Sequence, residues 1–330
     1  MGNLEKAKIY FIEANRCFTE LSEKSEDLSW KQELFLSLSR LAAVDYLLTG
    51  NNELYEKAIP MGEYFIKTGF LPFSINGLLI IYRDYVFGEK KFDHISDVIK
   101  NIIVISERFN QGESSRIKET LKSVQFMAME CIDTINADKR TRILLCKYAL
   151  QSMSRAVNEI YDQDFLKTSE ANIWFCIECY GYLQDLEMDS DLSGVLNDLC
   201  IQLEQEINLF QNASGECDDE VVVPAYIELG RIYEKCTEYD KAFEAFLKAV
   251  TCQRVSMKTD RYSYRRVYFS LNDCGRMKVA MGKPKEAVAF FENAVECINE
   301  MYAQGIDGDN DDRDNYKMIQ ETIKQIASLE

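Results

Sequence analysis

Two stretches in the C-terminal third of the chain place the same residue types at the same spacing. In each, a glycine comes twelve residues before a run of the form Ala-x3-Phe-x2-Ala. The repeated residues are Gly230, Ala242, Phe246 and Ala249 in the first stretch, and Gly275, Ala287, Phe291 and Ala294 in the second. Small residues let two helices cross closely, and the phenylalanine is expected to fill the space against the neighbouring pair. The pattern predicts buried residues in helix pairs that stack on one another.

This spacing resembles that of the tetratricopeptide repeat (TPR), a helix–turn–helix unit that stacks into a solenoid. The resemblance is clearest over residues 221–303. It implies an all-α fold, a right-handed superhelix of antiparallel helix pairs. It also implies a non-enzymatic protein- or peptide-binding module that acts as a scaffold or adaptor. The alternative is a ligand- or peptide-sensing regulatory domain of a larger bacterial-type signalling protein, because peptide receptors of that type also carry TPR units.

Three parts of the chain differ in how well they follow the repeat. Residues 1–212 are predicted to form degenerate TPR-like helical repeats, residues 213–303 two well-matched units, and residues 304–330 an acidic loop and a C-terminal capping helix. The first residues carry the second half of a unit, in which Phe11 is expected to be buried. This half unit is either a capping helix without a partner or a piece of a longer protein.

Amphipathic helices of about 15–20 residues, separated by short polar breaks, are predicted along the whole chain. Four prolines and 15 glycines in 330 residues leave long segments uninterrupted, and the sequence has no convincing alternating pattern of a strand. The expected helices span residues 3–22, 29–48, 53–67, 73–87, 92–109, 114–133, 138–161, 166–185, 190–211, 221–236, 239–255, 260–281, 285–303 and 313–328.

The chain is strongly acidic, with a net charge of −17. This charge argues against nucleic acid as a partner, because phosphate binding needs a basic surface, and it favours attraction to a basic partner. The sequence contains neither a signal peptide nor an apolar run of about 18 residues, so no membrane association is expected. The 11 cysteines have no disulfide-like spacing, which predicts free thiols in a reducing compartment, the cytoplasm.

The sequence does not predict an enzyme, a metal site or a cofactor. The single histidine, His94, has no accompanying nucleophile motif, and no phosphate-binding glycine loop occurs. Cys176 and Cys179 form a C-x-x-C pair, but a structural zinc site needs two further ligands, so core packing is favoured. The aspartates of residues 307–314 lack the glycine and glutamate that a calcium loop requires. A solvated acidic loop is expected there instead.

Basic residues gather within this otherwise acidic chain. Residues 253–283 contain eight basic residues against Asp260 and Asp273, a local net charge of +6. In TPR proteins the first helix of each pair lines the concave groove, so the resemblance places ligand-binding side chains on the first helices of the two well-matched units. The expected ligand-binding residues are Arg231, Lys235, Asn272 and Arg276, with Arg265 at the margin.

The partner expected at this groove is a protein or peptide, in particular one with an acidic or carboxylate end. The cations have few acidic neighbours within their own segment, and Arg binds carboxylates well through paired N–H groups. The other interpretation is that these cations pair with surface acids and remain solvated.

Overall fold

The structure, a computed structural model, describes residues 2–68, 138–158, 165–214, 220–306 and 308–328, with short helical pieces at 77–78, 81–87, 97–98, 101, 104 and 131–132. Eleven α-helices and one short π-helix form the regular structure of these residues, and no strand occurs among them. The predicted all-α fold is therefore confirmed. The chain divides into two compact units, Met1–Ile160 and Tyr161–Glu330.

In the first unit, α1 packs against α2 and α2 against α3. The side chain of Asp27 caps α2 by accepting a hydrogen bond from the N–H of Ser29 at 2.9 Å. Gly50 ends α2 with a φ of 71°, a conformation that glycine adopts without strain. Buried aromatic rings, among them Phe35 and Phe65, fill the interior. The elements are α1 (Gly2–Lys24), α2 (Leu28–Thr49), α3 (Glu53–Thr68), the π-helix η1 (Tyr82–Phe87) and α7 (Lys139–Asn158).

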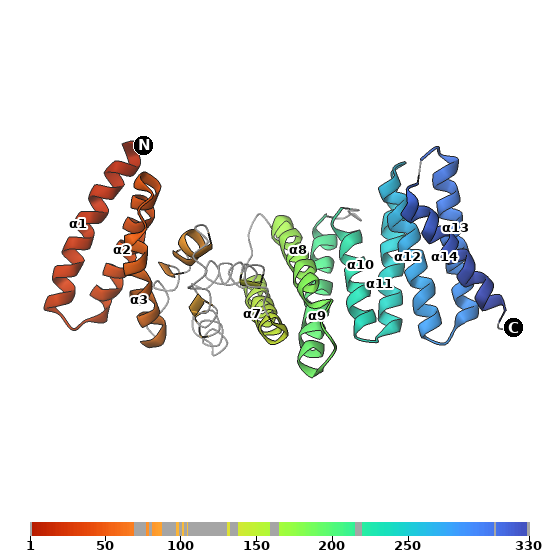
Figure 1. Cartoon of the computed structure of the whole chain (residues 1–330), viewed down its shortest axis with the longest axis horizontal. Coiled ribbons are helices and arrows are strands. Elements are labelled where there is room, and N and C mark those ends of the chain that lie inside the picture. The colour runs from red at the N-terminus through yellow and green to blue at the C-terminus, as the bar shows by residue number, and fades with distance from the viewer. Residues whose placement is uncertain are drawn as a thin grey trace. The chain divides into compact units, whose positions relative to one another are not determined.

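In the second unit, the helices follow one another as antiparallel neighbours in chain order (Figure 1). Three consecutive pairs, α8 with α9, α10 with α11 and α12 with α13, are followed by α14, which packs on α13. This arrangement confirms the predicted helix pairs. The elements are α8 (Phe165–Leu183), α9 (Ser190–Ser214), α10 (Val222–Lys235), α11 (Tyr239–Val255), α12 (Arg261–Ala280), α13 (Pro284–Ala303) and α14 (Asn310–Ala327).

The two C-terminal pairs share the same turn. Thr237 and Gly282 occupy equivalent positions after α10 and α12, and both have positive φ, 61° and 74°. The N–H of Glu238 donates to the Tyr233 carbonyl at 2.9 Å. In the second turn, the N–H of Lys283 donates to the Lys278 carbonyl, also at 2.9 Å. These bonds satisfy the last carbonyls of each first helix and turn the chain back at once.

A glycine on the first helix and a phenylalanine on the second fit together in each of these pairs. A Cβ atom placed on Gly230 would lie 2.6 Å from the ring of Phe246, and one placed on Gly275 would lie 2.5 Å from the ring of Phe291. The two rings are 0% and 1% exposed, and the four alanines of the repeated pattern are fully buried. The predicted burial is confirmed. The rings contact the glycine of their own pair, however, whereas the sequence pattern was expected to direct them against the neighbouring pair.

The helix boundaries agree with the sequence prediction to within three residues wherever the structure describes both ends. The helices expected at 92–109 and 114–133 lie largely outside the described residues, and the one expected at 73–87 is described at 77–78 and 81–87, where Tyr82–Phe87 forms a π-helix. The burial predicted for Phe11 is wrong, because its side chain is only half-buried on a helix that packs mainly on α2. The right-handed superhelix and the boundaries at residues 212 and 303 remain predictions.

The interface between α8 and α9 contains a buried carboxyl group. Glu206 is 0% exposed, and its Oε1 accepts hydrogen bonds from Asn172 Nδ2 at 3.0 Å and Gln202 Nε2 at 3.2 Å. Its Oε2 has no hydrogen-bond partner among the described residues. Burial raises the pKa of Glu206, and the hydrogen bonds to its carboxyl group offset this shift only in part.

Replacing Gly275 by alanine should destabilise the protein, because the added methyl group would displace the buried ring of Phe291. We expect a loss of about 1–3 kcal/mol in the free energy of unfolding, measured by chemical denaturation. Gly194, on the surface of α9, provides the matched control, since no atom lies within 4 Å of a Cβ placed there. Gly194→Ala should stabilise the protein by up to about 1 kcal/mol. Equal changes in the free energy of unfolding for Gly275→Ala and Gly194→Ala would contradict the packing role of Gly275.

Replacing Glu206 by glutamine should stabilise the protein at neutral pH. The raised pKa means that the folded state holds the proton to a higher pH than the unfolded state does, so the stability of the wild type falls as pH rises from the ordinary pKa of a glutamate through this raised pKa. Glutamine keeps an acceptor for Asn172 and carries no charge, and a gain of roughly 1 kcal/mol is expected. Denaturation at several pH values should show the gain shrink in acid, whereas the exposed Glu244→Gln should change little.

Candidate functional site

Two of the five expected binding residues share one surface, formed by consecutive first helices. Arg276 on α12 donates from Nη1 to Asp273 at 2.6 Å and forms an ion pair through Nη2 with Glu234 on α10. Arg231 on α10 donates from Nη1 to Glu228 at 2.6 Å. We name these five residues the α10–α12 patch. The pair between Arg276 and Glu234 joins the two helices directly.

In the α10–α12 patch the carboxylates are more deeply buried than the guanidinium groups, which face the solvent. The side chains of Arg231 and Arg276 are each 50% exposed, whereas those of Glu228 and Asp273 are 19% and 14% exposed. Burial raises the pKa values of Asp273, Glu228 and Glu234, and the neighbouring arginines oppose this shift. The partly buried carboxylates thus hold the guanidinium groups in fixed positions.

The expectation that this surface is basic is wrong, because acids from outside the basic segment pair with the two arginines. The α10–α12 patch holds three carboxylates for two guanidinium groups. Two of the carboxylates, Glu228 and Glu234, belong to α10, outside the basic segment, so a count along α12 could not include them. The patch is a paired ionic surface and not a basic one.

Lys235 lies on α10 with its ammonium group engaged by the backbone. Its Nζ donates to the carbonyls of Gln184 and Leu186, both at 2.8 Å. These carbonyls lie directly after α8, where a helix leaves acceptors without partners and where a cation is favourable. Lys235 therefore connects α10 to the end of α8.

Arg265 is also engaged, in a cluster that joins α12 to α14. Its Nε donates to Asp312 Oδ1 at 2.8 Å, and Arg261 Nε donates to Asp312 Oδ2 at 2.9 Å. The hydroxyl of Tyr268 donates to Asp312 Oδ1 at 2.5 Å, and Asp309 pairs with both arginines. We name these five residues the α12–α14 clamp.

The acidic loop before α14 is not simply solvated, as the sequence was taken to indicate. Asp312 is 0% exposed, and it forms a capping box with Asp309, in which each side chain accepts from the N–H of the other residue, at 2.9 and 3.1 Å. Burial alone would raise the pKa of Asp312, but hydrogen bonds from Tyr268 and the Asp309 N–H, together with the charge of Arg265, lower it. The Asp-x-x-Asp spacing before a helix was the available sequence signal.

Asn272 is the fifth expected residue. It lies one turn before Arg276 on α12 and is half-buried. Its side-chain amide has no hydrogen-bond partner within the described part of the chain. The amide is therefore free to donate and accept hydrogen bonds beside the α10–α12 patch.

The remaining sequence candidates fall into the core or outside the described residues. Cys176 and Cys179 are both fully buried, and burial raises the pKa of the Cys176 thiol. No cluster of three or more His, Cys, Asp or Glu side chains suited to a metal occurs in the part of the chain that the structure covers. His94 lies outside that part. Among the described helices, none combines the length and apolar character needed to span a bilayer.

Comparison with known proteins finds a family match over one helix pair. Residues 223–254, which cover all but the first residue of α10 and all but the last residue of α11, match the family model of the tetratricopeptide repeat. No curated protein matches the chain. The match supports the resemblance seen in the sequence and indicates a module that is usually not catalytic.

Three solved structures of low sequence identity are similar to this chain. BtubC from P. vanneervenii is 14% identical with a TM-score of 0.33, over 93% of this chain and 94% of its own. The apo form of RapI is 13% identical with a TM-score of 0.35, and the match covers 99% of this chain and 86% of RapI. A chain of the APC/C heterotetramer Cut9–Hcn1 is 11% identical with a TM-score of 0.23, and the match covers 90% of this chain and 64% of that chain. With TM-scores below 0.5, none superimposes closely on the chain as a whole.

Replacing Asp312 by asparagine should loosen α14. The variant would place an amide N–H against Arg261 or Arg265 and remove the buried carboxylate that the two arginines share, which costs about 1.5–3 kcal/mol. Because the folded pKa is lowered, the contribution of Asp312 is present above the ordinary pKa of an aspartate and is lost as pH falls through the lowered value.

Amide hydrogen exchange along α14 measures this effect. Exchange should accelerate in Asp312→Asn and remain unchanged in Asp314→Asn, a control at an exposed position of the same helix. Unchanged protection of α14 in the first variant would show that the clamp does not hold the helix.

Proposed function

We propose that this chain, which carries a tetratricopeptide repeat at residues 223–254, is a non-enzymatic module that binds a protein or peptide and acts as a scaffold or adaptor. Repeat modules of this type expose one face of their first helices as an extended binding surface. We place the ligand on the α10–α12 patch, with Asn272 beside it.

One observation carries this proposal. Arg276 contacts Asp273 on its own helix and Glu234 on α10, yet half of its side chain stays exposed. A guanidinium group has five N–H donors, so donors remain for a ligand after both carboxylates are served. Because the group is already fixed in place, a ligand that contacts it costs little further side-chain entropy. Arg231 is held in the same way by Glu228.

The ligand that fits is a peptide carboxylate, at a C-terminus or on an acidic side chain. Its two oxygens match the outward N–H groups of Arg231 or Arg276 in a bidentate bond. The amide of Asn272 would bind a peptide group next to it. We do not assign ligand contacts to Lys235 and Arg265, because carbonyls and carboxylates of the protein already hold them.

Replacing both Arg231 and Arg276 by glutamine should weaken binding of an acidic peptide with a free C-terminus by at least about tenfold, since each charged hydrogen bond contributes roughly 1.5–3 kcal/mol. Isothermal titration calorimetry measures this. Glutamine is preferred to glutamate, because another carboxylate beside Glu234 and Asp273 would repel them and destabilise the fold. The control is Arg254→Gln with Arg313→Gln, two exposed arginines on other helices with the same change in charge.

Two further readouts separate a specific site from a general charge effect. The same peptide with an amidated C-terminus should bind the wild type more weakly than the free acid does. The double variant should reduce its affinity by a smaller factor than it reduces that of the free acid. Affinity should also rise as pH is lowered toward the ordinary pKa of a carboxylate, as long as the peptide carboxylate stays ionised. The raised pKa values of Asp273 and Glu228 mean that they take up protons at a higher pH than the peptide does, which removes negative charge around the ligand. Full affinity in the double variant would refute the proposed site.

A further inference from the structure

A groove between α13 and α14 is lined by charged and polar side chains. Its volume is about 470 Å³. Within the described part of the chain, the side chains of Glu292, Glu296, Gln320 and Lys324 form no ion pair and no hydrogen bond. This differs from the α10–α12 patch and the α12–α14 clamp, where every charged group is paired.

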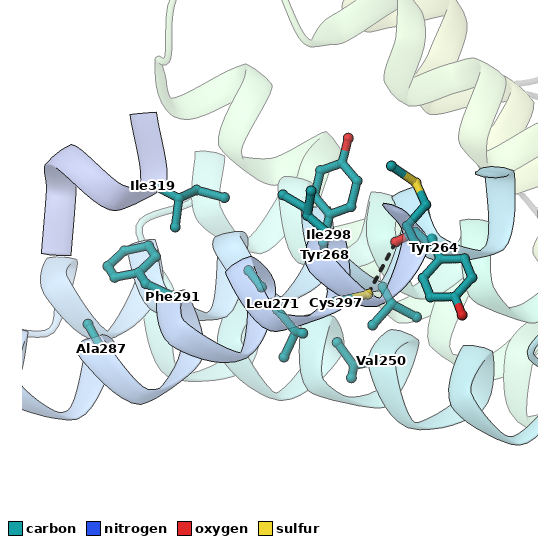
Figure 2. Packing of buried hydrophobic residues seen from close by; sticks show 12 residues of the cluster. Val250, Tyr264, Tyr268, Leu271, Ala287, Phe291, Cys297, Ile298 and Ile319 are labelled. Carbon is teal, nitrogen blue, oxygen red and sulfur yellow. Dashed lines mark hydrogen bonds between the residues drawn. The ribbon is translucent and has the colours of Figure 1, made fainter. Parts of the chain in front are cut away.

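The floor of the groove is apolar and firmly supported. Val295 from α13 and Ile323 from α14 line it, and both are half-buried. They pack against the core cluster drawn in Figure 2, to which Phe291 and Ile319 belong, each 1% exposed. The floor is therefore an extension of the hydrophobic core that remains open to an apolar group from outside.

The rim of the groove is acidic on the side of α13. Glu292 and Glu296 are exposed and lie one helical turn apart, and Lys324 is exposed on α14. Side chains four residues apart on a helix lie one above the other. The two carboxylates therefore form a row along α13, beside the apolar floor.

We propose that this groove docks an amphipathic helix of a partner protein, with apolar side chains on Val295 and Ile323 and basic side chains one turn apart on Glu292 and Glu296. A helix laid against α13 presents Lys or Arg residues at the same four-residue spacing as the carboxylates. The net charge of −17 also draws a basic partner toward the chain and repels a second copy of it.

A synthetic peptide tests this proposal without knowledge of the natural partner. The probe is a fluorescent amphipathic helix of about 18 residues made of Leu and Lys, and its counterpart made of Leu and Glu. Fluorescence anisotropy should show binding of the Lys peptide and not of the Glu peptide. The double variant Glu292→Lys with Glu296→Lys should bind the Lys peptide roughly tenfold more weakly, because two partly desolvated ion pairs become repulsive.

A matched control separates the groove from the overall charge. Asp240→Lys with Glu244→Lys makes the same change in charge, also one turn apart, on exposed positions of α11. It should weaken binding by no more than about twofold. Arg231→Gln with Arg276→Gln should leave binding of this probe unchanged, so the groove and the α10–α12 patch are tested independently.

The location of the bound peptide supplies the second measurement. A photoreactive group on its apolar face should cross-link to residues 292–299 of α13 or 320–324 of α14, read out by mass spectrometry. Equal loss of affinity in both charge-reversal variants, cross-links elsewhere, or an effect of the groove variants on self-association in sedimentation would each overturn the proposal.

Discussion

The contact between a glycine on one helix and a phenylalanine ring on the next sets the geometry of the C-terminal part of this chain. Phe246 occupies the space that a side chain on Gly230 would take, and Phe291 does the same at Gly275. Neither ring can move away, because both are buried and protein interiors are densely packed. The position of α10 relative to α11, and of α12 relative to α13, follows from these two contacts.

Charge is used in three different ways along the surface that this packing creates. In the α12–α14 clamp, a fully buried carboxylate holds two arginines and a tyrosine, and the result is attachment of a helix. In the α10–α12 patch, partly buried carboxylates hold half-exposed arginines in position. In the groove between α13 and α14, the carboxylates pair with no residue of the described part of the chain.

The sequence was sufficient to predict the elements that depend on local spacing. The helix boundaries and the buried residues of the two clear pairs follow from helical periodicity and from small residues at fixed intervals. Phe11 shows the limit of this reasoning, since burial of a repeat residue requires a helix on each side. The pattern did not predict the contacts of Phe246 and Phe291 with the glycines of their own pairs, because spacing identifies a large buried residue but not every helix that it contacts.

The candidate site was predicted less well, because it depends on contacts between distant residues. Arg276 and Glu234 are 42 positions apart and belong to different helices, so counting charges within residues 253–283 could not reveal their pairing. Similarly, a run of aspartates suggested a solvated loop, whereas Asp312 became buried only because Arg261, Arg265 and Tyr268 face it from α12. Net charge along a sequence does not indicate which acid lies opposite which base.

The fit of Phe246 against Gly230 has a consequence for ligand selectivity. Arg231 follows Gly230 directly on α10, and Arg276 follows Gly275 directly on α12. Each arginine therefore stands next to the point at which its helix is pressed against a ring, on a backbone whose position that ring determines. A change in the size of either ring would alter the separation of the two guanidinium groups without touching a ligand. At the binding site proposed for the α10–α12 patch, interior residues that do not contact the ligand would therefore help to determine which ligand binds.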